Sequence, residues 1–216
     1  MAEAEQPGNT KVTREDWISV ALETLISDGI EQVKVLSLAK KMHVSRSSFY
    51  WYFKDRRDLL NVLLDHWMNT NTQAIIDACD QPAPTITQAI CNVFVGFVDP
   101  DRFHTRLDFA IRDWARRDPD VRTVLDRSET KRIGALKDLY VRFGYPERES
   151  LARARVVYYM QIGYNDADLD EPMADRLILV PEYIFAYTGH HPAEGEVEAF
   201  RALTLKLGYA EKVGDE

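Results

Sequence analysis

The stretch LAKKMHVSRSSFYWYFKDRRDLL, residues 38–60, decides the fold of this 216-residue chain. Its pattern predicts two short helices, from about residue 36 to 42 and from 46 to 53, with a tight turn between them. Ser45 precedes the second helix, where its hydroxyl is placed to cap the first turn. A short helix, a tight turn and a second short helix form the helix-turn-helix motif, whose second helix enters the major groove of DNA.

The second of these helices has two different sides. Helical spacing places a set of polar and aromatic side chains on the exposed side, where they suit contacts with base edges and phosphates: Arg46, Ser47, Tyr50 and Trp51. Phe49 and Phe53 are four residues apart, and we expect them to turn inward to a small core.

Positive charge is concentrated in the same region. The chain has 27 Lys and Arg against 35 Asp and Glu, a formal charge of −8. Residues 33–57 nevertheless carry +6, so the rest of the chain carries −14, the difference between −8 and +6. A local positive field favours duplex DNA because phosphate neutralisation supplies most non-specific affinity, although a charge run can also be only a solvated face. The charged residues of this window are Lys34, Lys40, Lys41, Arg46, Lys54, Arg56 and Arg57, with Asp55 as the one acid.

The remaining sequence has helical periodicity, without the sustained alternation of a β-strand. Residues 1–12 are expected to be a polar, disordered tail, and Thr13 with Asp16 marks the start of the first helix. We therefore expect an all-α protein, with a helix-turn-helix domain at 13–60 and a larger helical regulatory and dimerisation domain at 61–210. The helices outside the motif are predicted at 13–29, 55–79 (capped by Asp55), 85–98, 104–117, 119–143, 148–165, 173–188 and 194–207.

Residues 38–60 resemble the DNA-binding head of the TetR family of bacterial transcriptional regulators. The shared features are a leucine followed by alanine, a turn that ends in valine and serine, a tyrosine with further aromatics, and a lysine before a leucine pair. The resemblance extends over about residues 13–64 and implies contacts with bases, phosphates or the DNA backbone. The residues expected to contact DNA are Ser45, Arg46, Ser47, Ser48, Tyr50, Trp51, Tyr52, Lys54 and Arg56, the last standing where the family usually has a phosphate-binding lysine.

Two positions depart from the family pattern. His43 replaces the usual glycine of the turn, at a position that is expected to need a positive φ and is strained for histidine. Val35 stands where a threonine often caps the second helix and contacts phosphate, so we expect a weaker cap there.

The resemblance also implies a homodimer. In the family, the last two main helices of two subunits form a four-helix interface, which by position here lies within about residues 148–188. These two helices are apolar on more than one side, which indicates a second packing partner. Pro181 is expected to kink the second of them without ending it, because it leaves the Leu177 carbonyl unpaired.

Aromatic side chains in the larger domain predict a cavity for a small-molecule effector, or simply a packed core. The identity of such an effector does not follow from the sequence. The residues predicted to line the cavity are Trp67, Asn71, Phe97, Arg106, Phe109, Trp114, Tyr140, Tyr159 and Gln161.

Other classes of function have no support in the sequence. Cys79 and Cys91 have no spacing typical of a metal site, and we expect both to be buried thiols. We find no motif of a hydrolase, a nucleotide-binding loop or a metalloprotease, and we expect no enzyme activity, no cofactor and no metal. The chain has neither a membrane-spanning run nor a signal-peptide pattern, so we expect a cytoplasmic protein.

The sequence therefore predicts a ligand-responsive transcriptional regulator, a repressor by family habit, that binds a palindromic DNA operator as a homodimer and is released by a small molecule. One alternative is a helical small-molecule-binding protein or enzyme whose basic head does not read DNA. Another is a DNA-binding regulator without an inducer.

Overall fold

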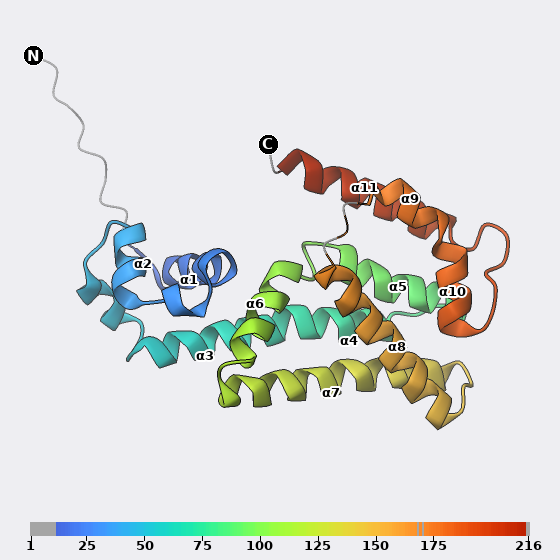
Figure 1. The fold of residues 1–216 in the computed structure, drawn as a ribbon, viewed down its shortest axis with the longest axis horizontal. Coiled ribbons are helices and arrows are strands. Elements are labelled where there is room, and N and C mark those ends of the chain that lie inside the picture. The colour runs from blue at the N-terminus through green and yellow to red at the C-terminus, as the bar shows by residue number, and fades with distance from the viewer. Residues whose placement is uncertain (1–11, 168, 170, 215–216) are drawn as a thin grey trace, which may run out of the picture. The chain divides into compact units, whose positions relative to one another are not determined.

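The computed structural model describes residues 12–167, 169 and 171–214 (Figure 1). The described residues form helices joined by turns, without a β-strand, which confirms the all-α class. They divide into two compact units, here called the head and the body, with the boundary between His66 and Trp67. The predicted tail at 1–12 lies outside the described residues, except for Val12.

The head is built from short helices around an aromatic core. Thr13 begins α1 with a reciprocal capping box: its hydroxyl accepts from the Asp16 N–H, and its own N–H donates to the Asp16 carboxylate at 2.7 Å. Phe49 is fully buried, with its ring centroid 5.2 Å from that of Trp17 and 5.1 Å from that of Phe53. The inward orientation predicted for Phe49 and Phe53 is confirmed. The elements of the head are α1 (Arg14–Asp28), η1 (Ile30–Gln32), α2 (Val35–Lys41), η2 (Arg46–Trp51) and α3 (Arg56–Trp67).

The second helix of the motif differs from the prediction in its geometry. It is a 3₁₀ helix that ends at Trp51, because its N–H groups pair with carbonyls three residues back, as from Ser48 to Ser45 and from Tyr52 to Phe49. The expected cap by Ser45 is wrong, since the Ser45 hydroxyl lies 2.8 Å from the Ser47 hydroxyl instead. The Ser48 hydroxyl also donates to the Ser45 carbonyl, which favours the tighter turn.

A continuous helical path leads from the head into the body. Asp55 precedes α3 and accepts the Asp58 N–H at 2.9 Å, as expected of a capping residue. The predicted helix at 55–79 is present, but it contains an unexpected wide turn: α3 passes into a π-helical turn, η3 (Met68–Thr72), before α4 (Gln73–Asp80). Turns of this kind are rare and occur often at functional sites.

The helices of the body pack around a shared hydrophobic core (Figure 1). α7 contacts α4, α6 and α8, while α5 contacts α4, α10 and α11. Gly96 allows α5 to approach α4 closely, because a Cβ at Gly96 would lie 2.9 Å from the Cβ of Ala78. Cys79 and Cys91 are buried, unpaired thiols, as predicted. The remaining body helices are α5 (Ile86–Val98), α6 (Thr105–Ala115), α7 (Pro119–Arg142), α8 (Glu147–Asp166), α9 (Met173–Ile178), α10 (Val180–Thr188) and α11 (Glu198–Gly214).

Two helix boundaries in the body correct the sequence prediction. The helix expected at 173–188 is not simply kinked: α9 ends at Ile178 and α10 begins at Val180, because Pro181 cannot donate to a carbonyl four residues back and takes an N-terminal position instead. The last helix begins at Glu198, after Gly195 adopts a φ of 75° in the preceding turn. Among the residues that the structure describes, no helix has the length and apolar character needed to cross a membrane.

Candidate nucleic-acid interface and effector cavity

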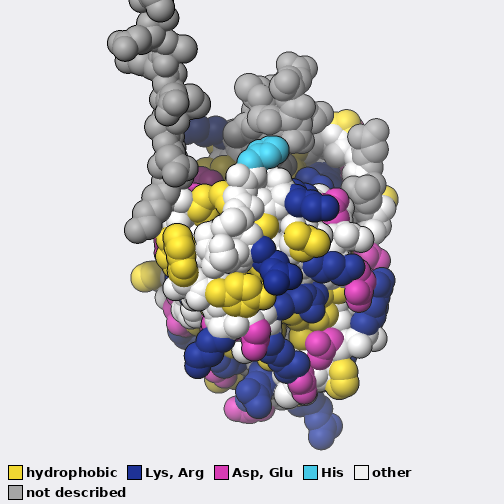
Figure 2. All heavy atoms as spheres, turned by 90° about the vertical axis from the view of Figure 1, so that its left-hand side faces the viewer, with side chains coloured by type: hydrophobic (Ala, Val, Ile, Leu, Met, Phe, Trp, Pro, Cys, Tyr) yellow, Lys and Arg dark blue, Asp and Glu magenta, His cyan; other side chains and the backbone are white. Residues whose placement is uncertain are grey.

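The outer side of η2 presents aromatic and basic side chains to solvent. Tyr50 and Trp51 are 52% and 72% exposed, and Arg46 and Ser47 are exposed beside them. Large aromatic side chains at this exposure contribute little to the core, while Phe49 of the same helix is fully buried. Figure 2, which views the side of the molecule on the left of Figure 1, shows Lys and Arg side chains gathered among exposed hydrophobic ones. This surface combines charge for phosphates with side chains for base edges.

Three of the residues predicted to contact DNA are engaged within the head. Ser48 is buried, and its hydroxyl donates to the Ser45 carbonyl at 2.8 Å. The hydroxyl of Tyr52 donates to the Val12 carbonyl at 2.7 Å. Arg56 donates its Nη2 to the Ile30 carbonyl at 2.9 Å, and its Nε to the Val33 carbonyl. These side chains stabilise the head, and the hydroxyls of Ser48 and Tyr52 would have to give up these bonds in order to donate to DNA.

The positive charges around η2 also include exposed lysines. Lys41 is held by Asp28, with 2.7 Å between Nζ and Oδ2, and by the Thr24 hydroxyl. Lys34, Lys40 and Lys54 are exposed, as Lys41 also is. Exposed basic side chains of this kind can neutralise phosphates.

The turn before η2 has the geometry that the sequence predicted. His43 has a φ of 56°, the left-handed value that favours glycine. The His43 N–H donates to Lys40 and the Val44 N–H to Ala39, which is the Schellman pattern of helix termination. At the other end of α2 the N-cap residue is Lys34 rather than Val35, and no side chain caps the helix.

Four of the nine residues predicted to line an effector cavity are packed or paired instead. Trp67 and Asn71 are fully buried, and their polar atoms bond to Asp108 and to the His104 backbone. Tyr140 is fully buried, with its hydroxyl on the Tyr187 carbonyl. Trp114 is 4% exposed. For these four residues the alternative interpretation, core packing, holds. Helical periodicity alone could not distinguish them from residues of a cavity wall.

The other five predicted residues are distributed over several hollows in the body. Gln161 lines a cavity of about 120 Å³ between α5, α8, α9, α10 and α11. Phe97 and Arg106 line an adjoining cavity of about 290 Å³. Phe109 lines a separate pocket against α7. Tyr159 is 45% exposed on α8, where it borders a further surface pocket.

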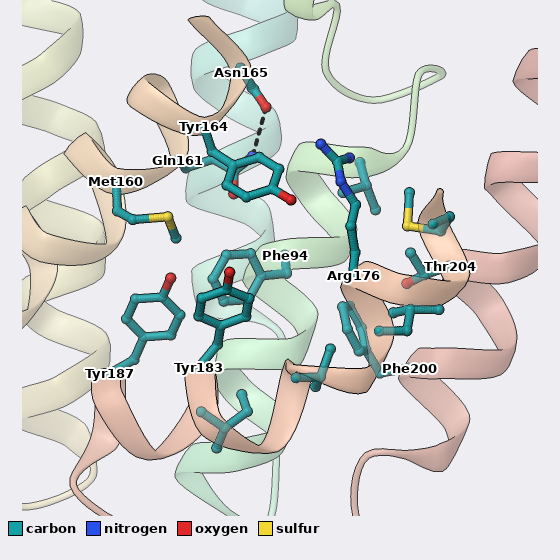
Figure 3. Close-up of a pocket in the computed structure, with 15 residues that line it drawn as sticks. Phe94, Met160, Gln161, Tyr164, Asn165, Arg176, Tyr183, Tyr187, Phe200 and Thr204 are labelled. Atoms are coloured by element: carbon teal, nitrogen blue, oxygen red, sulfur yellow. Dashed lines mark hydrogen bonds between the residues drawn. The ribbon is translucent and has the colours of Figure 1, made fainter. Parts of the chain in front are cut away.

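The cavity of about 120 Å³ is walled in part by aromatic residues outside the nine that were predicted to line a cavity (Figure 3). Tyr183 and Tyr187 stack at 6.2 Å between ring centroids, and Phe94 lies 5.4 Å from Tyr187. Arg176 and Thr204 also line it. Arg176, Tyr183 and Tyr187 come from the segment predicted for dimerisation, whereas Phe94 lies on α5 and Thr204 on α11. No local sequence signal distinguishes these residues as a cavity wall.

A buried charge network lies elsewhere in the body, beside the π-helical turn. Asp108 is 3% exposed and accepts hydrogen bonds from Arg132 Nη1 at 2.9 Å, Arg112 Nε at 2.9 Å and Trp67 Nε1 at 2.8 Å. Burial alone would raise the pKa of the Asp108 carboxyl, but the two arginines and the Trp67 N–H hold that pKa below its ordinary value of 3.8. Arg132 also donates to the Thr72 hydroxyl, which ties the network to η3.

The sequence and the fold can now be compared with those of known proteins. Residues 18–63 match the profile of the bacterial regulatory proteins of the tetR family. The class C tetracycline repressor protein of Escherichia coli is 36% identical over 61 residues, which span 28% of this chain and 28% of that repressor. Two solved structures are similar over most of this chain.

A transcriptional regulator from Rhodococcus sp. Rha1 is 15% identical, with a TM-score of 0.57 over 90% of this chain and 97% of that one. AmtR from Mycobacterium smegmatis is 16% identical, with a TM-score of 0.60 over 94% of this chain and 98% of its own. At such identities these two structures indicate the shared fold alone.

The fold and the head define a helix-turn-helix protein with a larger helical body. The profile match lies on the elements that build the outward-facing η2 surface. Over residues 18–63 the chain resembles the bacterial regulatory proteins of the tetR family, and over most of its length it shares the fold of the two solved structures.

Proposed function

We propose that this protein is a repressor that binds a palindromic operator as a homodimer and is released when a small molecule binds in the body. The observation that carries the DNA-binding part is the outer side of η2, where Tyr50 and Trp51 are 52% and 72% exposed beside Arg46. The matched relative is itself named as a repressor, which supports that direction of regulation. If the head did not bind DNA, the exposure of these aromatic side chains would have no functional explanation.

The test of DNA binding is a titration against duplexes from upstream of the protein's own gene, beside a scrambled duplex, at two salt concentrations. We expect sequence-dependent binding whose salt slope reflects about −0.9 per neutralised phosphate. Arg46→Ala and Tyr50→Ala should each weaken operator binding about tenfold or more. Arg122→Ala removes an exposed arginine of α7 and serves as the control. Wild-type affinity in both head variants would refute the assignment of η2.

Exposed apolar side chains support the dimer. On α8, Val156 is 54% exposed and Leu151 is 42% exposed. Ile178 of α9 and Phe185 of α10 are 69% and 43% exposed. Large apolar side chains left exposed on the helices predicted for dimerisation support an interface there. Sedimentation should therefore give a dimer for the wild type and a monomer for Val156→Asp, and an unchanged dimer in that variant would contradict an interface through α8.

The proposed route from ligand to DNA uses the helix that continues through η3. In the body, Trp67 and Thr72 are bonded to Asp108 and Arg132, so a ligand that moves these partners also acts on the helix leading to the head. A coupling of about 1–3 kcal/mol would lower operator affinity roughly 5- to 150-fold. If no ligand of the body changes operator affinity, the protein is a regulator without an inducer.

A further inference from the structure

We infer that the effector is a small arene carboxylate, with one aromatic ring in the cavity of about 120 Å³ and its carboxylate at Arg176 and Thr204. This inference rests on the proposed ligand response and specifies its chemistry. It follows from the size of the cavity, from two polar groups in its wall and from the charges around it.

The size of the cavity limits the apolar part of the ligand to about one ring. An apolar cavity of about 150 Å³ binds benzene, and this one measures about 120 Å³. Phe94, Tyr183 and Tyr187 form one of its walls (Figure 3). Aromatic side chains in edge and stacked arrangements favour an aromatic ring over an alkyl chain of equal volume.

Two polar groups in the wall have unused hydrogen-bonding capacity. Thr204 is 2% exposed, and its hydroxyl has no partner among the described residues. The Nε of Arg176 is likewise buried and makes no hydrogen bond there, although it lies 3.5 Å from the Glu171 carboxylate. A buried hydroxyl left without a partner is costly, and an arginine can only donate. A ligand oxygen that accepts from both groups would satisfy them.

The position of these two groups indicates where the ligand's polar end lies. Arg176 and Thr204 line both the cavity of about 120 Å³ and the adjoining cavity of about 290 Å³. Figure 3 shows them on the side of the cavity opposite Tyr187. A ligand with its ring beside Tyr187 therefore directs its head group toward the shared wall.

The charges around that wall favour an anion. The described lining of the two cavities includes Arg176 and Arg106 and no Asp or Glu. Glu171 is the carboxylate that faces Arg176, but it also accepts the Tyr164 hydroxyl, and its contact with Nε is an ion pair without a hydrogen bond. A ligand carboxylate, with two oxygens, can bind the guanidinium and the Thr204 hydroxyl together.

The test compares acids with their neutral amides. The full-length protein is titrated calorimetrically with benzoate, phenylacetate and 3-phenylpropionate, with the corresponding primary amides, and with 2-naphthylacetate as a two-ring acid. We expect at least one of the one-ring acids to bind about tenfold or more tightly than its amide. The two-ring acid should bind more weakly than that acid. Equal binding of acids and amides, or no binding of the acids, would overturn the inference.

Variants locate the site. Arg176→Gln should remove the preference for the acid, and Thr204→Val should weaken binding of the acid while keeping the fold. Arg201→Gln is the matched control, because Arg201 has the same partial exposure, 29% against 28%, and pairs with a glutamate outside the cavity. If Arg176→Gln keeps the full preference, or Arg201→Gln loses it, the carboxylate does not bind at this wall.

A parallel measurement of operator binding separates the two proposals. Acids that bind through Arg176 without releasing DNA would support this site and refute the proposed ligand response. Release of DNA by a neutral molecule that fills the cavity, with acids inactive, would support the ligand response and refute the carboxylate class.

Discussion

Replacing Asp108 by Asn tests whether the buried charge network holds the body together. The substitution preserves the shape of the side chain but removes its charge. Oδ1 accepts from Trp67 and Arg132, and Oδ2 accepts from Arg112, so the amide NH₂ of Asn would face at least one donor. The lost ion pair and the clash of donors both lower the free energy of unfolding.

The size of the destabilisation depends on the contacts that each arginine keeps after Asp108 is replaced. Arg112 retains Glu129, with 2.7 Å between Nη1 and Oε1, and the Tyr158 hydroxyl. Arg132 is 1% exposed, and among the described residues the contacts that it retains are neutral, with the Thr72 hydroxyl and the rings of Trp67 and Phe103. Leaving a buried cation without its partner costs about 3–5 kcal/mol. That is a large part of the stability of a typical domain, about 5–15 kcal/mol.

Urea unfolding followed by tryptophan fluorescence measures the effect. Asp126→Asn is the control, since its ion pair with Arg122 is 54% and 56% exposed and should contribute no more than about 1 kcal/mol. Arg132→Met in the Asp108→Asn background should recover part of the loss, because it removes the unpaired charge. A loss in Asp108→Asn no greater than in the control would refute the reasoning.

The same network predicts a pH dependence. Because the folded pKa of Asp108 lies below the unfolded value of 3.8, its contribution to stability is present above pH 3.8 and is lost as the pH falls through the folded pKa. The free energy of unfolding of Asp108→Asn should therefore fall less steeply below pH 3.8 than that of the wild type. Parallel curves for the two proteins in that range would show that Asp108 does not titrate as described.

Three further substitutions test local features of the fold by thermal or urea unfolding. His43→Gly should stabilise the head by up to about 1 kcal/mol, because glycine adopts the φ of 56° without strain, and a destabilised variant would contradict this. Thr13→Ala should cost about 1 kcal/mol through loss of the cap on α1, whereas an unchanged midpoint would mean that the cap contributes nothing. Gly96→Val should cost about 1–3 kcal/mol and should be partly rescued by Ala78→Gly, and failure of that rescue would argue against a clash with α4.

The head could be predicted because its signals are local. The cap at Thr13 and the left-handed turn at His43 depend on residues within a few positions along the chain, and the four-residue spacing of Phe49 and Phe53 indicated their inward side. The 3₁₀ geometry of η2 escaped prediction, since it depends on how Ser45 and Ser48 share their hydrogen bonds. Nothing in helical periodicity separates a turn of three residues from one of 3.6 over such a short segment.

The body was predictable in its helices but not in its interior. Asp108 meets Trp67 from 41 positions away and Arg132 from 24 positions away, and no spacing rule connects them. The cavity likewise draws residues from α5 and α11, more than 100 positions apart in the sequence. Aromatic residues such as Tyr140 and Tyr187 have the same periodic signal whether they fill the core or face a cavity. Only tertiary packing separates those two outcomes.

The two buried thiols make the natural chain a convenient background for spectroscopic labelling. Burial raises the pKa of Cys79 and of Cys91 to about 12, and the thiolate is the form that reacts with maleimides and methanethiosulfonates. At neutral pH both native cysteines should remain unmodified while the protein is folded. One cysteine introduced on the exposed side of the head would then carry the probe. In the proposed homodimer, the distance between two such probes could be followed as a candidate effector is added, without first replacing either native cysteine.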